Sequence, residues 1–249
     1  MRIENSFIPI RGVGETTERR LWEAGITHWN AFDGSVVGPT TADRIHEFVD
    51  VATDHLGRGN ARFFDDAFPS GERWRLYENF RDDALFFDIE TTGLDAARND
   101  VTTVSVHRDG DTDTLVRGDN LTVDALRERF ADAPLIVSFN GARFDVPFLE
   151  ESFPVSIDAP HLDLMYPCRR LDLTGGLKRI ERDVGIDRDR PDLSGRDAVR
   201  LWREYERGDD AALETLVSYN REDTRNLERL ADLVTSRLHD TCCPADATF

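Results

Sequence analysis

The chain has 249 residues, 39% of them hydrophobic, which is enough to bury the core of an α/β domain beside a smaller unit. No apolar run approaches the ~18 residues of a membrane span, and the first residues lack the charged-then-apolar layout of a secretory signal, so we expect a cytoplasmic protein with no membrane partner. The three cysteines, two of them adjacent, exclude an ordinary disulfide framework, and the net charge of -18 excludes a surface that is basic overall.

The first 57 residues are expected to form a small helical unit. Residues 16–24 are a short amphipathic stretch, and residues 41–56 are a longer one with apolar side chains at helical spacing. Residues 58–82 are rich in Gly, Arg, Asp and aromatic side chains with little clear period, which indicates a linker.

Two glycines, Gly12 and Gly14, precede the first of these helices. The segment resembles a helix-hairpin-helix element, in which a Gly-x-Gly turn exposes backbone N–H groups that can hold a DNA phosphate without reading the bases. The alternative is that the glycines only permit a tight turn and that Thr16 caps a helix. The sequence leaves both interpretations open.

A larger domain is expected over residues 83–240, followed by a tail at 241–249. Apolar runs and turn residues predict strands over 84–89, 101–106, 112–116, 135–139 and 157–164, and helices over 121–130, 144–151, 177–184, 195–206 and 209–238. Asp109 and Gly110 form the turn of a hairpin, which makes the first three strands a meander. The order favours an α/β fold, with an open mixed sheet flanked by helices.

Asp88 and Glu90 stand two residues apart on the first of these strands. Their side chains therefore point to the same face, and both can reach one metal ion. The alternative is a pair of solvent-facing acids, which is common in a chain with 49 acidic residues. The apolar neighbours of the pair indicate a buried strand instead, and a cation is the simplest partner for buried carboxylates.

Two later segments carry further acids. Asn140 ends a predicted strand and Asp145 starts the next helix, where an acid is also favoured by the helix dipole alone. Tyr219 and Asp223 are four residues apart on a predicted helix and so share a face. The second pair also fits half-buried packing beside a solvated charge pattern.

Taken in order, the three segments resemble the exonuclease motifs of the DEDD (DnaQ-like) superfamily, in the subgroup that has tyrosine in the third motif. The stretches FFDIETTGLD, NGARFDVPFL and HLDLMYPCRRLDLTGGLKRIERDVGI are most similar to YprB-type ribonuclease H-like proteins, over roughly residues 84–237. In that group histidine is more often expected at the position of Tyr219. The resemblance implies a ribonuclease H-like fold and a metal-dependent 3′-5′ exonuclease acting on DNA or RNA.

The resemblance also implies a mechanism with two divalent cations. Asp88 would bridge both cations, Glu90 and Asp223 would hold the one that activates water, and Asp145 would support the other. Because all these ligands are carboxylates, Mg²⁺ or Mn²⁺ is favoured over zinc. Tyr219 would orient the attacking water, since a phenol with an ordinary pKa near ~10 is a weak general base.

Other residues are candidates for substrate binding. Near the motifs these are Thr91, Asn140 and Phe144, and in the densest basic stretch of the domain they include Arg169, Arg170 and Lys178. Each of the first three can also be purely structural. The basic stretch fits a solvated helix face equally well.

The acidic charge does not exclude a nucleic-acid partner. Lys178 is the only lysine among 31 basic residues, and this composition resembles that of halophilic proteins, of the haloarchaeal type. At about 1 M salt the Debye length falls to ~3 Å, so the net charge stops indicating which partners bind. We therefore expect nucleic acid as the partner, either a single-stranded end or a duplex with a 3′ end.

Several alternatives remain at this point. A non-catalytic nucleic-acid-binding or scaffold protein is expected to have lost metal ligands, whereas all four carboxylates are present here. A proofreading subunit of a polymerase and a structure-specific ribonuclease H-like endonuclease also fit, because two-metal chemistry does not itself require a free end. The oligomeric state is open.

Overall fold

The computed structural model describes residues 1–243; residues 244–249, and with them most of the expected tail at 241–249, lie outside the described residues. The chain divides into two compact units. One comprises Met1–Asp82 and the segment from Asp232 onward, and the other comprises Asp83–Ala231. Within the described part, no helix is both long enough and apolar enough to cross a membrane.

The unit Asp83–Ala231 is built on a mixed five-stranded sheet with the order β3-β2-β1-β4-β5. Its strands are β1 (Leu85–Thr91), β2 (Val101–Arg108), β3 (Asp111–Val116), β4 (Ile136–Ser138) and β5 (His161–Asp163). The central strand, β1, pairs antiparallel with β2 and parallel with β4. The expected α/β fold, a mixed sheet flanked by helices, is confirmed.

β2 and β3 form the expected hairpin. Asp109 and Gly110 close it, with φ angles of 51° and 78°. Positive φ at both central residues gives a turn whose twist matches that of the two strands. Together with β1, the hairpin makes the predicted meander of three antiparallel strands.

Helices cover both faces of this sheet. They are α5 (Val123–Phe130), α6 (Asp145–Ser152), α7 (Met165–Arg170), α8 (Leu177–Val184), α9 (Gly195–Tyr205) and α10 (Asp210–Cys242). Only the part of α10 up to Ala231 belongs to this unit. The short α7 was not expected from the sequence, because a helix of one to two turns that contains Pro167 has no visible period.

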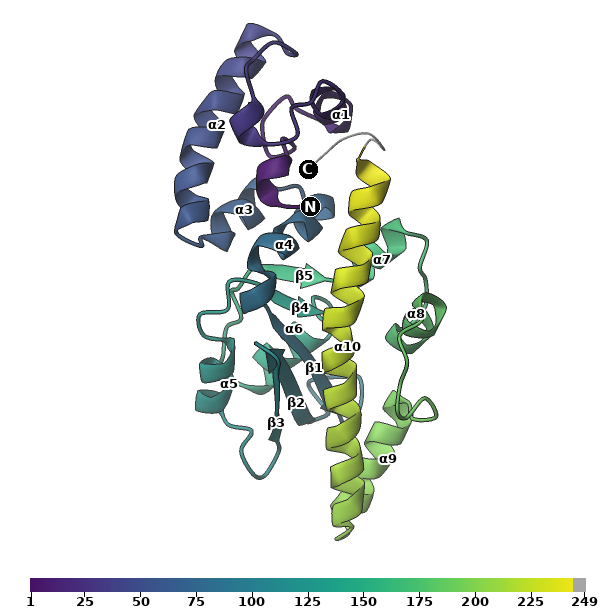
Figure 1. Cartoon of the computed structure of the whole chain (residues 1–249). Coiled ribbons are helices and arrows are strands. Elements are labelled where there is room, and N and C mark those ends of the chain that lie inside the picture. Colours follow the sequence, from purple (N-terminus) through teal and green to yellow (C-terminus); the bar gives the residue numbers. More distant parts are fainter. Residues whose placement is uncertain (244–249) are drawn as a thin grey trace. The chain divides into compact units, whose positions relative to one another are not determined.

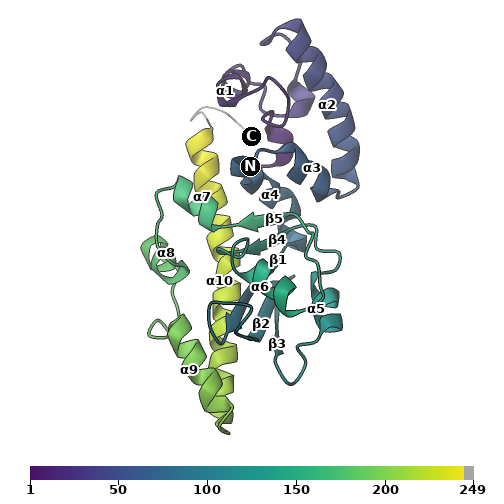
Figure 2. The ribbon, with the colours of Figure 1, turned by 180° about the vertical axis from the view of Figure 1, so that it is seen from behind.

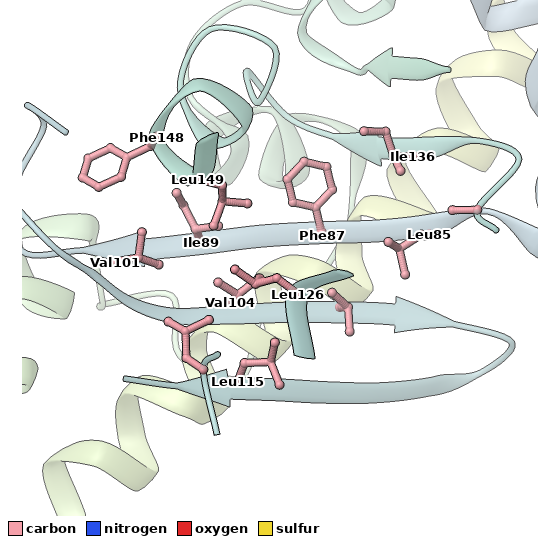
Figure 3. Packing of buried hydrophobic residues seen from close by; sticks show 13 residues of the cluster. Leu85, Phe87, Ile89, Val101, Val104, Leu115, Leu126, Ile136, Phe148 and Leu149 are labelled. Atoms are coloured by element: carbon pink, nitrogen blue, oxygen red, sulfur yellow. The ribbon is translucent and has the colours of Figure 1, made fainter. Parts of the chain in front are cut away.

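The hydrophobic core of the unit lies on one face of the sheet. Leu85, Phe87 and Ile89 point to this face because side chains alternate along β1. They pack against α5 and α6, and Figure 3 shows Phe148 and Leu149 of α6 close to Ile89. The core therefore fixes the positions of β1 and of the start of α6 relative to each other.

The opposite face of β1 carries Asp88 and is covered by α10 (Figures 1 and 2). Side-chain hydrogen bonds tie α10 to the neighbouring strand β2. Thr103 donates to Asn220 Oδ1 at 2.9 Å, and His107 Nε2 lies 3.2 Å from a carboxylate oxygen of Glu228. Because the contact between helix and sheet includes these polar pairs, α10 has a defined rotation about its axis.

The other unit is helical. Its elements are α1 (Glu15–Glu23), α2 (Pro39–Gly57), α3 (Ala61–Ala67) and α4 (Tyr77–Phe80), with the 3₁₀ turns η1 (Ile3–Asn5), η2 (Trp29–Ala31), η3 (Ser70–Leu76) and η4 (Arg81–Asp83), the last reaching the unit boundary. The expected linker at 58–82 is thus helical over much of its length. Pro69 and Gly71 divide it into short pieces, and a 3₁₀ segment lacks the 3.6-residue period that identifies an α-helix in a sequence.

A buried charge cluster fixes the loop that precedes α1. The guanidinium of Arg75 lies 3.0 Å from Glu18 and 2.6 Å from Glu72. Glu18 in turn accepts hydrogen bonds from the hydroxyl of Ser6 at 2.8 Å and from the backbone N–H of Phe7 at 2.7 Å. The loop before the Gly-x-Gly turn is therefore held by Glu18 of α1, which in turn is paired with Arg75 of η3.

The Gly-x-Gly turn itself leads directly into α1. Gly12 has a φ of +95°, a conformation that favours glycine, and a Cβ there would lie 3.4 Å from Nη1 of Arg44. Gly14 is the N-cap residue of α1. The backbone thus gives Gly12 a structural reason to be glycine, while the contact of this turn with DNA stays a prediction.

Candidate active site

β1 brings Asp88 and Glu90 to one face of the sheet. The two residues pair with β2 in regular register, which then shifts between Glu90 and Thr91. A shift of this kind bends the end of the strand. Glu90 is buried and Asp88 is half-buried, so two carboxylates lie side by side at the end of the central strand.

Asp223 of α10 completes a group of three carboxylates. One oxygen each from Asp88, Glu90 and Asp223 lies within 4.8 Å of the others. Tyr219 precedes Asp223 by one helical turn, and both side chains are buried. The structure therefore brings the first and third sequence segments together.

Asp145, the fourth predicted carboxylate, is the first residue of α6. Its Oδ1 accepts a hydrogen bond at 3.2 Å from the backbone N–H of Ile89, the residue between Asp88 and Glu90. Burial first, and the charge of Asp88 second, raise the pKa of Asp145 well above its ordinary value. Asp145 is thus electrostatically part of the same group.

The loop between β4 and α6 is held by Asp163 of β5. The carboxylate of Asp163 accepts hydrogen bonds from the backbone N–H of Asn140 at 2.7 Å and of Ala142 at 3.2 Å. Asn140 has a φ of 65°, and a Cβ on Gly141 would lie 2.8 Å from Cβ of Ser138, closer than real contacts allow. Close packing and these hydrogen bonds therefore define where α6, and with it Asp145, begins.

Asn220 orients the carboxylate of Asp88. It is fully buried at 0% exposure, and its Nδ2 donates to Oδ2 of Asp88 at 2.7 Å. Its Oδ1 accepts from the hydroxyl of Thr103, as described above. Both ends of the Asn220 amide are used, so Asp88 is held by a group whose own orientation is fixed.

Arg188 inserts its guanidinium among the acids of this site. It lies between α8 and α9, its side chain is 5% exposed, and it contacts Glu181 at 2.6 Å, Glu222 at 3.8 Å and also Asp223. Glu181 is fully buried, and Glu222 also accepts a hydrogen bond from the backbone N–H of Asp189. Arg188 is therefore a cation that two further carboxylates hold against Asp223.

Lys178 of α8 brings a second cation. Its ammonium lies 4.4 Å from the ring centroid of Tyr219, and the guanidinium carbon of Arg188 lies 5.8 Å from the same centroid. Nζ of Lys178 is buried and has no hydrogen-bond partner in the described part of the chain. Burial first, and the charge of Arg188 second, lower the pKa of Lys178.

A family model described as the RNase_H superfamily matches residues 85–235 of the chain. The match covers more than half of the sequence and includes the five strands, α10 as far as residue 235 and all four carboxylates. The chain belongs to the RNase_H superfamily.

Several proteins of known structure are similar to part of the chain. They include a nuclease in its apo form (24% identity over 64% of this chain and 74% of that chain, TM-score 0.47) and NrnC of Brucella melitensis (22% identity over 66% and 78%, TM-score 0.46). The family B DNA polymerase of the hyperthermophilic archaeon Pyrobaculum calidifontis is similar over 61% of this chain but only 24% of its own length, with 22% identity and a TM-score of 0.49. No curated protein matches the chain.

The carboxylates of this RNase_H superfamily member carry shifted pKa values. Burial raises the pKa of Asp88 to about 7, although the hydrogen bond from Asn220 lowers it. Burial first, and then the charges of Asp88 and Asp145, raise the pKa of Glu90 well above its ordinary value. Burial, followed by the charge of Glu90, also raises the pKa of Tyr219, so its hydroxyl stays protonated at neutral pH.

These residues fit a divalent cation. Three carboxylate oxygens lie within 4.8 Å of one another. Arg188 contacts Asp223, but Asp88 and Glu90 still repel each other, and a bound cation would relieve this repulsion. The group contains neither cysteine nor histidine, and a set of oxygen ligands alone suits Mg²⁺ or Mn²⁺. Asp88, Glu90 and Asp223, with Asp145 beside them, would hold the ion or ions.

Four other residues were predicted to bind the substrate. The hydroxyl of Thr91 donates at 2.7 Å to the backbone carbonyl two residues later. Phe144 precedes α6 and packs against the hydrophobic core. Arg169 and Arg170 are exposed at the end of α7. The structure gives Thr91 and Phe144 local packing or turn contacts, while the predicted substrate contacts of all four stay untested.

Sequence reasoning did not find Arg188, Asn220 or Asp163. Asn220 follows Tyr219 directly, and Asp163 lies near the end of the strand predicted over 157–164, so nearness to a motif and to a strand end were usable signals. Arg188 lies in the segment DRDRPD, which has no periodicity and alternates charges. Only the tertiary fold distinguishes Arg188 from the other arginines of that segment.

Proposed function

We propose that this chain is a metal-dependent nuclease that hydrolyses phosphodiester bonds and removes nucleotides from 3′ ends. The observation that carries the proposal is the meeting of Asp88, Glu90 and Asp223 within 4.8 Å, beside Asp145, in an RNase_H superfamily fold. Carboxylates grouped in this way on the end of a central strand and a covering helix can hold cations against a phosphate.

The four carboxylates would together bind two divalent cations. When bound, Mg²⁺ or Mn²⁺ would activate a water molecule and stabilise the leaving oxygen of an in-line displacement. Asp88 would help to hold both ions, Glu90 and Asp223 would hold the ion that activates water, and Asp145 would help to hold the other. Nδ2 of Asn220 donates a hydrogen bond of 2.7 Å to Oδ2 of Asp88, which fixes the orientation of the Asp88 carboxylate.

Tyr219 would orient the attacking water without taking its proton. Its raised pKa keeps the phenol neutral, and the Lys178 ammonium lies 4.4 Å from the centroid of its ring. A neutral hydroxyl can accept one hydrogen bond and donate another, which is enough to fix the water relative to the phosphate.

Further residues would bind the substrate. We propose that Asn140, Thr91 and Phe144 contact the terminal nucleotide, because they surround the ends of β1 and β4. Arg169 and Arg170 would contact phosphates from α7.

In the helical unit, Gly12 and Gly14 would offer backbone N–H groups at the start of α1 to a DNA phosphate. This contact supplies affinity without a basic surface, which suits a chain with a net charge of -18.

Substitution of the carboxylates tests the proposed function. Asp88→Ala and Asp223→Asn should abolish nucleotide release in Mg²⁺ or Mn²⁺, while circular dichroism shows an intact fold. Asp192→Asn, an acid in the exposed segment before α9, is a matched control and should cleave like the natural chain. Full activity of Asp88→Ala or Asp223→Asn would rule out the proposed site.

A further inference from the structure

A pocket of about 470 Å³ adjoins the candidate active site along α8 and the segment that follows it. Its lining residues are Lys178, Arg179, Arg182, Gly185, Ile186, Asp187, Arg188 and Pro191. Four of these carry a positive charge, in a chain whose net charge is -18. Arg188 is already paired with Glu181 and Asp223, so Lys178, Arg179 and Arg182 are the pocket cations left for a ligand. A local concentration of cations against the overall charge indicates an anionic ligand.

The inner wall of the pocket adjoins Tyr219 and Asp223 of the candidate active site. Lys178 lies over the ring of Tyr219, and Arg188 contacts Asp223, so both belong to the pocket and to the site. The Lys178 ammonium is buried without a hydrogen-bond partner in the described residues. A buried ammonium has three donors, and leaving them unused is costly, so a partner from outside the protein is expected to accept from it.

The outer wall is formed by Arg179 and Arg182 of α8. Both side chains are exposed, and Arg179 lies 3.6 Å from Asp183, a separation and exposure at which an ion pair contributes little. Asp187 is the acidic residue among those that line the pocket. The guanidinium groups of the outer wall can therefore turn toward a phosphate at small energetic cost.

We propose that this pocket binds a backbone phosphate of the substrate strand, next to the one that is cleaved. The proposal rests on the nuclease function proposed above. One guanidinium group can donate to two oxygens of the same phosphate, and an ammonium group attracts a phosphate as a point charge. The pocket offers both kinds of contact to one anion. Its connection to Asp223 through Arg188 places the bound phosphate adjacent to the cleaved one along the strand.

This arrangement predicts that the length of the substrate affects how tightly it binds. An ester with a single phosphate occupies only the carboxylate site, whereas an oligonucleotide also fills the pocket. The pocket should therefore lower KM for oligonucleotides without changing the turnover of a single-phosphate ester, because its contacts lie away from the bond that breaks.

Arg182→Glu tests the proposal, with Arg203→Glu as its matched control. Arg203 is an exposed arginine on α9, so the control makes the same change in net charge outside the pocket. Binding of a fluorescein-labelled single-stranded oligonucleotide is measured by anisotropy, with Ca²⁺ in place of Mg²⁺. Arg182→Glu should weaken binding about tenfold, the size expected for one charged hydrogen-bonding contact, and reduce the slope of log K against log salt by about 0.7. Arg203→Glu should change neither quantity.

Hydrolysis then separates the pocket from the proposed function. With thymidine 5′-(p-nitrophenyl phosphate) and Mn²⁺, Arg182→Glu should keep the kcat/KM of the natural chain, while its KM for the oligonucleotide rises. If the natural chain cleaves neither compound, the nuclease function fails. If it cleaves both and Arg182→Glu binds the oligonucleotide normally, or loses activity on both substrates equally, the pocket is not a second phosphate site.

Discussion

Replacement of Arg188 by leucine should destabilise the unit that contains the candidate active site. The guanidinium lies 2.6 Å from Glu181, whose side chain is fully buried. Arg188→Leu removes this cation and leaves the carboxylate uncompensated. Breaking a buried ion pair from one side costs about 3–5 kcal/mol, a large fraction of the stability of an ordinary domain.

A double substitution separates the ion pair from simple loss of packing. Arg188→Leu with Glu181→Leu replaces both charges by apolar side chains, which is often close to neutral for a buried pair. The double variant should be more stable than Arg188→Leu alone by roughly 2 kcal/mol, within the range of coupling between contacting residues. Full recovery is not expected, because Arg188 also contacts Asp223.

The loss of folding stability in Arg188→Leu should depend on pH. Burial already raises the pKa of Glu181 above 4.5, and the charge of Arg188 opposes that rise. Without Arg188, the folded protein holds a proton on Glu181 more tightly than the unfolded chain does. Acid therefore stabilises the variant relative to neutral pH, and the difference from the natural chain shrinks as the pH falls toward 4.5.

Urea denaturation followed by circular dichroism in EDTA measures these free energies. Arg203→Leu, on the exposed face of α9, is the control and should lie within about 0.5 kcal/mol of the natural chain. The reasoning is refuted if Arg188→Leu is as stable as this control. It is also refuted if the double variant is less stable than Arg188→Leu.

Four further predictions follow from the same contacts. Asn220→Leu should cost about 1–3 kcal/mol in urea denaturation, because the hydroxyl of Thr103 loses its acceptor, and should lower the affinity for Mn²⁺ measured by calorimetry. Gly141→Ala should cost about 1–3 kcal/mol by overpacking, whereas Gly195→Ala, with open space around its Cβ, should be tolerated. In EDTA the melting temperature should fall as the pH rises from about 5 to 8, since the folded protein binds the proton of Asp88 up to about pH 7, and Mn²⁺ should remove this dependence. Raising KCl to about 1 M should increase the melting temperature, because salt screens the repulsion within a chain of net charge -18.

The regular parts of the fold could be predicted from the sequence because their periods are local. Alternation along β1 places Asp88 and Glu90 on one face of the sheet, and the helical period places Tyr219 and Asp223 on one face of α10. The hairpin at Asp109 was visible because only a few residues accept positive φ. Ordered motifs then indicated which faces meet.

The supporting contacts could not be predicted in the same way. Arg188 reaches Asp223 from an irregular segment, and Glu181, its partner, resembles any other acid of an amphipathic helix. Neither residue has a local pattern that separates it from its charged neighbours. The helical segment at 58–82 was missed for a related reason, since its buried aromatic side chains are divided among α3, η3 and α4 and do not lie on one continuous α-helix.

The most direct test of the nuclease assignment is cleavage of a 5′-labelled single-stranded oligonucleotide by the natural chain in Mn²⁺ and in EDTA. The carboxylate site predicts a ladder of products shortened one nucleotide at a time from the 3′ end in Mn²⁺, and an intact oligonucleotide in EDTA. Binding of the oligonucleotide without any cleavage in Mn²⁺, or equal cleavage in EDTA, would contradict the account.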